Sequence, residues 1–225
     1  MGDFVGACHV RFERAKEMLE EDPGLAKAAW DWGFGDWETA IGAASHTGRK
    51  DIIELLLTHG ARPDVFTLAT MDQVDAVRAF VENIRDARET EGPHSISLFR
   101  HAEAGKAARV LEYLESTGVD TGHDWFTTSP ELVRPLIGAY AWSPSPADRF
   151  TVGWFERLSC LTLATGGSPA RNLRPNSRDI AKEFRFQPAG SRGATVVFQG
   201  GTQQNEQLRV EYAGKVYKAQ RCADD

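Results

Sequence analysis

Residues 38–64 constrain the fold of this chain more than any other stretch. Their sequence, ETAIGAASHTGRKDIIELLLTHGARPD, holds two short helical patterns separated by a glycine-containing turn. Between Ile52 and Leu57 the second pattern carries an apolar stripe that is too broad for an isolated surface helix. Gly60 then occupies the usual position just beyond a helix end. Neither helix can bury its apolar residues alone, so the stretch predicts neighbouring helix pairs that cover one another.

Three other stretches of the first half carry the same order of a short apolar helix, a turn and a longer amphipathic helix. When the second helices are aligned, one apolar residue of each falls in register: Leu19, Leu57, Val81 and Leu114. Their spacings are 38, 24 and 33 residues. The sequence therefore predicts an α-solenoid of about four degenerate repeats over residues 1–122.

The helix pairs resemble ankyrin repeats, whose period is about 33 residues. The resemblance is strongest in residues 38–64, where the following residues match the consensus: Thr39, Ala43, Ala44, Gly48, Asp51, Ile52, Ile53, Leu56, Leu57, Gly60 and Ala61. The chain departs from the family at Gly42, where ankyrin repeats carry the histidine that bonds neighbouring repeats.

Three phrases resemble a bacterial ankyrin family with no assigned activity: GFGDWET at 33–39, GARPD at 60–64, and GPH at 92–94 with HA at 101–102. The resemblance implies a fold more securely than a function.

The second half changes to strand patterns. Ser129 and Pro130 predict the start of a short helix that reaches about Ile137. Short β-prone runs separated by turn residues follow, at 149–154, 158–163, 183–186, 194–198, 207–212 and 215–220. Ala213-Gly214 fits a two-residue hairpin turn. Regular short strands are typical of a small antiparallel barrel or curled sheet, so the whole chain is assigned to the α+β class.

Parts of this half resemble the lipocalin-like domain that follows some bacterial serine hydrolases. The matching phrases are LIGAY at 136–140, RNLRP at 171–175, FRF at 184–186, VVF at 196–198 and AQR at 219–221. That domain is accessory in those enzymes, so the resemblance implies no catalytic residues. The predicted organisation is an ankyrin-like domain over 1–122 and a short helix plus antiparallel β domain over 123–225, joined near 121–124.

Charge is divided unevenly along the chain, with a balance of −9 in residues 1–122 and +3 in residues 123–225. An acidic first half argues against nucleic acid as a partner, because duplex binding needs phosphate-neutralising cations. No run approaches the roughly 18 apolar residues of a membrane span, and residues 1–21 lack the apolar core of a secretory signal. Three widely spaced cysteines do not form a disulfide framework. We expect a cytoplasmic monomer or weak dimer.

Five arginines give the second half a cationic stripe: Arg171, Arg174, Arg178, Arg185 and Arg192. The stripe could bind an acidic partner or dock against the acidic first half, and the opposed charges favour docking. The β domain is also expected to cap the last repeat, because Val110, Leu111 and Leu114 would otherwise face water.

The segment DWGFGDWE at 31–38 is the leading candidate for binding. Aromatic rings beside charges are typical of interface hot spots, and in an ankyrin frame this segment is a hairpin facing the concave groove. We predict a binding module that holds a protein partner in an acidic and aromatic groove. The candidate residues are Trp32, Phe34, Asp36, Trp37, Glu38, His94 and Arg100. The alternative is that the rings only cover the end of a small core.

A second hypothesis is an enzyme with a small-molecule pocket between the two domains or at the mouth of the β domain. His94 or His101 would act as general acid or base, oriented by Asp36 or Glu38, in isomerase, dehydratase or cyclase chemistry. If His94 and His101 were helical they would lie about 10 Å apart, too far for one zinc ion. No HExxH or CxxC motif occurs, so no metal ligand and no cofactor are assigned. The alternative is that both imidazoles are structural, as is expected for His46.

Overall fold

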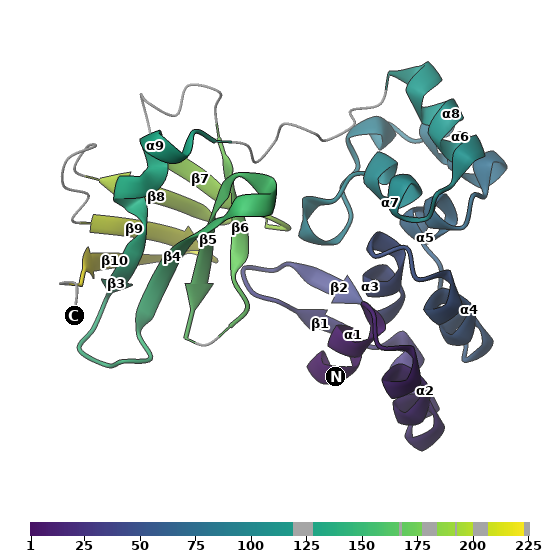
Figure 1. The fold of residues 1–225 in the computed structure, drawn as a ribbon, viewed down its shortest axis with the longest axis horizontal. Helices are drawn as coiled ribbons and strands as arrows, with labels where there is room; N and C mark the ends of the chain where they lie inside the picture. Colours follow the sequence, from purple (N-terminus) through teal and green to yellow (C-terminus); the bar gives the residue numbers. More distant parts are fainter. Residues whose placement is uncertain (119–127, 167, 177–183, 192, 200–206, 223–225) are drawn as a thin grey trace. The chain divides into compact units, whose positions relative to one another are not determined.

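A computed structural model describes residues 1–118, 128–166, 168–176, 184–191, 193–199 and 207–222 (Figure 1). The chain divides into two compact units. Unit 1 comprises Met1–Asp31 and Asp36–His123, and unit 2 comprises Trp32–Gly35 and Asp124–Asp225. The expected junction near 121–124 lies outside the described residues, as do Arg178 and Arg192. Together the units form an α+β protein with a closed β-barrel.

Unit 1 is built from pairs of helices (Figure 1). The first helix of each pair packs on the first helix of the next: α1 on α3, α3 on α5, and α5 on α7. The helices are α1 Gly2–Cys8, α2 Phe12–Glu21, α3 Ala40–His46, α4 Lys50–Thr58, α5 Val65–Thr70, α6 Val74–Asn83, α7 Leu98–Ala104 and α8 Ala108–Thr117. Among the described residues no helix is long and apolar enough to cross a membrane.

Side-chain caps fix where the first helices begin. Thr39 accepts a hydrogen bond from the Gly42 amide at 3.0 Å at the start of α3, and Asp64 accepts one from the Thr67 amide at 2.8 Å at the start of α5. Ser97 caps α7 in the same way. Each cap satisfies one of the amides that a helix start leaves without an internal partner.

The expected register is off by one residue in α4. Leu56 is fully buried, whereas Leu57 is 36% exposed. In a helix the side-chain direction rotates by about 100° from one residue to the next. Ile52, Ile53 and Leu56 therefore share the buried face, and Leu57 lies beyond the edge of that face.

Successive first helices approach closely because small and hydroxyl-bearing residues line their contacts. A Cβ atom on Gly105 would collide with the carbonyl oxygen of Thr70. The Thr70 hydroxyl in turn lies 2.9 Å from the carbonyl oxygen of Ser45 and 3.2 Å from that of His101. These contacts bring three neighbouring helices to one buried polar seam.

Short elements connect the helix pairs. Strand β1 Ala29–Asp31 pairs antiparallel with β2 Trp37–Thr39. The 3-10 turns are η1 Pro23–Lys27, η2 Ala87–Glu89 and η3 Pro93–Ser95. His94 lies in η3 with a φ of 60°, four residues before α7 begins, so it does not share a helix with His101.

Unit 2 is a closed antiparallel barrel with the strand order β10-β3-β4-β5-β6-β7-β8-β9. The strands are β3 Gly138–Ala141, β4 Arg149–Phe155, β5 Cys160–Thr165, β6 Arg171–Pro175, β7 Arg185–Pro188, β8 Thr195–Gln199, β9 Gln207–Tyr212 and β10 Lys215–Arg221. Helix α9 Pro130–Val133 and turn η4 Arg134–Leu136 precede β3, and turn η5 Glu156–Leu158 precedes β5. The prediction of a β-barrel is confirmed.

The strand predictions differ from the structure at several places. Strand β7 spans Arg185–Pro188, whereas the predicted run is 183–186, whose first residue lies outside the described residues. Strands β3 and β6 were not assigned from β-propensity, since β3 is only four residues long and β6 carries two arginines and a proline. Strand β5 begins at Cys160 rather than at 158, because Ser159 adopts a φ of 47° and ends turn η5. The Ala213-Gly214 turn is confirmed, with φ values of 50° and 75°.

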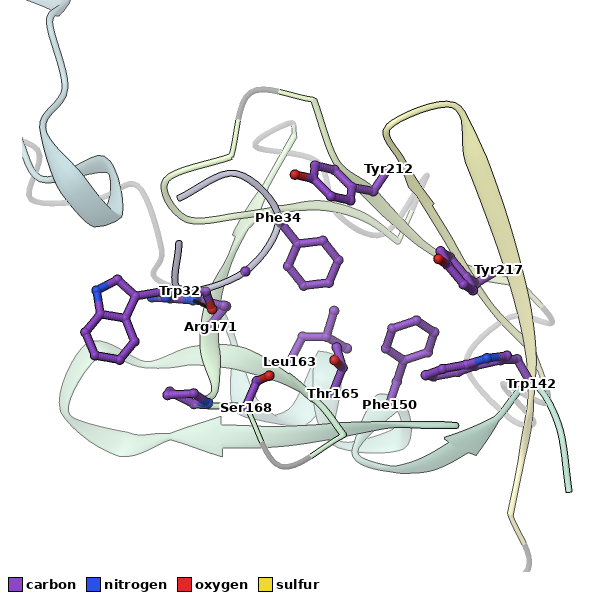
Figure 2. Close-up of a pocket in the computed structure, with 12 residues that line it drawn as sticks. Trp32, Phe34, Trp142, Phe150, Leu163, Thr165, Ser168, Arg171, Tyr212 and Tyr217 are labelled. Carbon is purple, nitrogen blue, oxygen red and sulfur yellow. Dashed lines mark hydrogen bonds between the residues drawn. The ribbon is translucent and has the colours of Figure 1, made fainter. Parts of the chain in front are cut away.

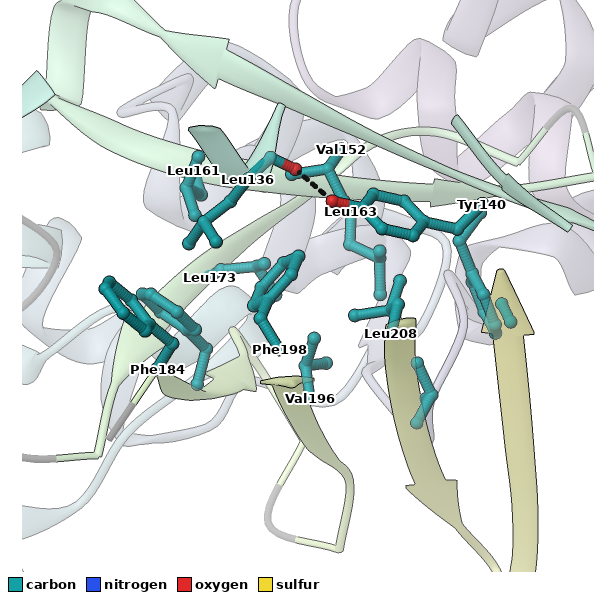
Figure 3. Packing of buried hydrophobic residues seen from close by; sticks show 14 of the residues in the cluster. Leu136, Tyr140, Val152, Leu161, Leu163, Leu173, Phe184, Val196, Phe198 and Leu208 are labelled. Carbon is teal, nitrogen blue, oxygen red and sulfur yellow. Dashed lines mark hydrogen bonds between the residues drawn. The ribbon is translucent and has the colours of Figure 1, made fainter. Parts of the chain in front are cut away.

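The barrel interior is filled by alternate apolar side chains of its strands (Figure 3). Val196 and Phe198 of β8 and Leu208 of β9 belong to this core. Tyr140 is fully buried, and its hydroxyl donates a hydrogen bond to the carbonyl oxygen of Leu136 at 2.9 Å. The short segment before β3 is thereby tied to the core.

Candidate functional site

Three imidazoles converge on one buried carboxylate in unit 1. Glu38 lies on β2 with a fully buried side chain. His9 Nε2 lies 3.4 Å from Glu38 Oε2. His46 Nε2 and His94 Nε2 lie 2.9 Å and 3.3 Å from Glu38 Oε1. We call His9, Glu38, His46 and His94 the histidine cluster.

Four separate segments supply the histidine cluster. His9 directly follows α1, and His46 is the last residue of α3. Because α1 packs on α3, the ends of these two helices lie together. Glu38 comes from β2 and His94 from turn η3. No two of the four residues are closer than eight positions in the chain, so the packing of unit 1 creates the cluster.

The Nδ1 atoms of two imidazoles are fixed by acceptors that cannot donate. His9 Nδ1 lies 3.1 Å from the carbonyl oxygen of Val5, and His94 Nδ1 lies 2.6 Å from Asp36 Oδ2. A carbonyl or a carboxylate oxygen only accepts, so Nδ1 carries the hydrogen in both rings. The Nε2 atoms therefore turn towards Glu38, and in the neutral tautomer each presents a lone pair there.

Asp36 holds His94 at two points. Besides Nδ1, the backbone amide of His94 donates to Asp36 Oδ1 at 3.0 Å. Asp36 is only 1% exposed. This double contact stabilises the positive φ of His94, a conformation that costs energy for a residue with a Cβ atom. A carboxylate behind a histidine is the usual outer-shell arrangement at metal sites.

The cluster shifts the pKa values of its members strongly. Burial opposes ionisation of Glu38, but its contacts with His46 and His94 outweigh burial and lower its pKa well below the usual range. Burial lowers the pKa of His94, but Asp36 and Glu38 overcome it and raise that pKa to about 9. Burial lowers the pKa of His9, with Glu38 acting in the opposite direction. A neutral His9 directs its Nε2 lone pair at the ionised Glu38 carboxylate, and the two groups repel each other. A cation bound between them would remove that repulsion.

The distances within the cluster suit a shared ion. One ligand atom from each of the four residues lies within 4.8 Å of the other three. Zinc binds imidazole nitrogen and carboxylate oxygen at about 2.0–2.2 Å, which places tetrahedral ligand atoms about 3.3–3.6 Å apart. The contacts of Glu38 with the three imidazoles, 2.9–3.4 Å, lie close to that range.

The close contact between His46 and Glu38 also fits a shared ion. His46 Nε2 is buried and 2.9 Å from Glu38 Oε1, yet this nitrogen has no hydrogen bond of ordinary geometry. A buried nitrogen in this position can bind an ion that the nearby carboxylate also binds. Ligands of one ion have this arrangement.

His101 stays outside the cluster. It is fully buried, packs on Phe66 with ring centroids 4.7 Å apart, and donates from Nδ1 to the carbonyl oxygen of Ser97 at 2.9 Å. Burial lowers its pKa to about 4, so the ring is neutral. Its ring centroid is 6.4 Å from that of His46.

The structure brings together three of the four residues selected for proton transfer, namely Asp36, Glu38 and His94. Sequence reasoning missed His9 and His46. A signal for them exists in Ala7-Cys8-His9 and Ala44-Ser45-His46, where each histidine ends or follows a first helix after a buried alanine. Equivalent positions in stacked helix pairs come together.

No protein-family model matches this chain. No curated protein and no solved structure gives a significant match.

The remaining binding candidates lie elsewhere. Trp37 is 64% exposed, and Arg100 forms an ion pair with Glu103 at 2.6 Å. Trp32 and Phe34 belong to unit 2, where they line a pocket of about 190 Å³ at the barrel (Figure 2).

Proposed function

We propose that unit 1 binds one divalent first-row transition-metal ion through His9, Glu38, His46 and His94. The observation that carries the proposal is the convergence of three imidazole Nε2 atoms on the buried Glu38 carboxylate, within 3.4 Å. Imidazole and carboxylate ligands suit zinc, copper, nickel or iron, whereas calcium and magnesium prefer all-oxygen sites. Four such ligands match the usual coordination number of zinc.

Each residue has a separate role in the proposed site. The three imidazoles bind through Nε2, and Glu38 supplies charge that offsets the ion. Asp36 and the Val5 carbonyl orient the His94 and His9 rings through Nδ1. The ion would join the end of α1, strand β2, the end of α3 and turn η3, and so stabilise unit 1 as a cross-link.

Solvent access would let the proposed site act on a small molecule. The side chains of His9 and His94 are 23% and 20% exposed, so one edge of the cluster reaches solvent. A bound transition-metal ion supplies Lewis acidity to a water or substrate oxygen that reaches it. Of the four residues selected for the proton-transfer hypothesis, Asp36, Glu38 and His94 position or bind the ion in this proposal, and His101 does not.

Metal analysis of the full chain tests the proposal. Protein purified without chelator and without a polyhistidine tag should carry about one transition-metal ion per chain. After removal of metal with EDTA, added Zn²⁺ or Co²⁺ should bind at one-to-one stoichiometry, and Mg²⁺ should not compete. The variants Glu38→Gln and His46→Gln should lose this binding. The control His59→Gln should keep it, because that ring contacts the Leu55 carbonyl outside the cluster.

Two results would overturn metal binding. One is a folded wild-type protein that takes up neither ion in calorimetry. The other is uptake that persists unchanged in both cluster variants.

A protein partner is a second proposal, and a different observation supports it. Trp30 and Trp37 lie on the paired strands β1 and β2 and are 43% and 64% exposed. Exposed tryptophans are enriched among the residues that dominate interfaces, and the ankyrin resemblance of unit 1 is consistent with this use. Substitution of Trp37 by alanine should abolish capture of such a partner while leaving metal content unchanged.

A further inference from the structure

The barrel of unit 2 holds a pocket whose walls are mainly aromatic (Figure 2). Its volume is about 190 Å³. An apolar cavity of about 150 Å³ is large enough for benzene in an engineered protein, so this pocket fits one ring with a short substituent. Barrel mouths are common places for small-molecule sites.

The aromatic walls hold each other in place. The rings of Trp142 and Phe150 lie 4.4 Å apart between centroids. Tyr217 packs edge-on against both, at 5.6 Å and 6.2 Å. Phe34 and Tyr212 form another edge-to-face pair at 5.5 Å. Such mutual packing keeps the pocket formed before a ligand arrives, which lowers the entropy cost of binding.

Phe34 lies in this wall because of a run of positive φ angles. Residues with a Cβ atom rarely adopt such angles. Phe34 has a φ of 58° and stands between Gly33 at 116° and Gly35 at 76°. The left-handed region disfavours a bulky residue such as phenylalanine. Figure 2 shows the Phe34 ring directed into the pocket rather than towards solvent. Strained residues of this kind cluster at ligand sites.

A cation lies at one end of the pocket. Arg171 begins β6 and is only 8% exposed. Its Nε donates to the carbonyl oxygen of Trp32 at 3.2 Å, and its guanidinium lies 5.8 Å from the Trp32 ring. Arg171 pairs with Leu163 across the sheet, so Thr165, two residues from Leu163, lies on the same face.

We infer that this pocket binds a single-ring aromatic carboxylate. The aromatic walls take the ring by edge-to-face and stacking contacts. The Arg171 guanidinium offers N–H groups in a planar fork that matches a carboxylate, and the Thr165 hydroxyl adds a donor. The ligand chemistry is thus set by one buried cation at the end of an aromatic pocket.

Benzoate is the probe for the full-length protein, followed by calorimetry and tryptophan fluorescence. It should bind saturably with a Kd below about 1 mM, as expected for a ligand of this size. Benzyl alcohol lacks the charge, and cyclohexanecarboxylate lacks the aromatic ring. Each should bind at least tenfold more weakly. Measurements in EDTA separate this result from the metal site of unit 1.

Two variants test whether benzoate binds in this pocket. Arg171→Lys keeps the charge but loses the planar fork, so it should weaken benzoate about tenfold and leave benzyl alcohol unchanged. Trp142→Leu removes one wall and should weaken both. Circular dichroism and the melting temperature establish that each variant is folded. The inference is overturned if folded wild type binds benzoate no better than benzyl alcohol, or if Trp142→Leu binds benzoate as wild type does.

Discussion

Asp36 accepts two hydrogen bonds from His94, one from the backbone amide at 3.0 Å and one from Nδ1 at 2.6 Å. This double contact fixes both the backbone and the ring of a residue whose Nε2 faces Glu38 at 3.3 Å. The aspartate therefore orients the imidazole without being a member of the histidine cluster.

Replacing Asp36 by asparagine should weaken zinc binding by about 10–100-fold without abolishing it, as is typical for outer-shell residues of metal sites. The amide oxygen can still accept from Nδ1, but it lacks the charge that favours the ring. Competition with a chromophoric chelator measures the affinity. An unchanged affinity would contradict the orienting role.

Removal of metal should lower the stability of unit 1. An ion present at a free concentration of 1,000 times its Kd adds about 4 kcal/mol to the free energy of unfolding. Urea unfolding followed by the helical circular dichroism signal reports on unit 1, which holds helices α1 to α8. In Glu38→Gln the curves with and without zinc should coincide, whereas in His59→Gln they should differ as in wild type.

His101 should make the metal-free protein less stable in acid. Its folded pKa of about 4 lies below the ordinary 6.5, so the unfolded chain binds more protons as pH falls from 6.5 towards 4. At about 1.4 kcal/mol per pH unit, the loss between pH 7.5 and pH 5 is about 2 kcal/mol.

The variant His101→Gln isolates this effect. Its free energy of unfolding should fall by about 2 kcal/mol less than that of wild type over the same interval, because contributions of the other histidines cancel in the comparison. Urea titrations in EDTA at each pH measure the difference. Parallel pH profiles would show that His101 does not titrate in this way.

Substitution of Gly105 by alanine should destabilise unit 1 by about 1–3 kcal/mol, the usual cost of overpacking. The added Cβ would meet the Thr70 carbonyl oxygen, and backbone cannot move aside as a side chain can. Gly193→Ala is the control, since no described atom lies within 4 Å of its added Cβ. In thermal unfolding, Gly105→Ala should have a lower melting temperature than Gly193→Ala.

Thiol labelling should distinguish the three cysteines. Burial raises the pKa of Cys8 to about 12 and that of Cys160 to about 11, which leaves almost no thiolate at neutral pH. Cys222 is partly exposed. A maleimide should label Cys222 rapidly in the native protein and the other two only after denaturation, as peptide mass spectrometry would detect.

Many local elements of both units can be predicted from the sequence. Apolar spacing predicted the helices around Ile52 and Leu56, and Ala213-Gly214 predicted the turn between β9 and β10. Alternating β-prone runs predicted an antiparallel barrel. These features depend on neighbouring residues and on the need to bury apolar faces, and both are visible in one dimension.

Which distant polar groups meet depends on how the helices pack. Asp36 and Glu38 are two residues apart and stood out together, but their partners His9, His46 and His94 come from three separate segments. Packing of α1 on α3 aligns the ends of these helices, and the strained turn at His94 brings in the third imidazole. Periodicity identifies the face that a helix buries, whereas the meeting of helix ends and turns is fixed by how the helices stack.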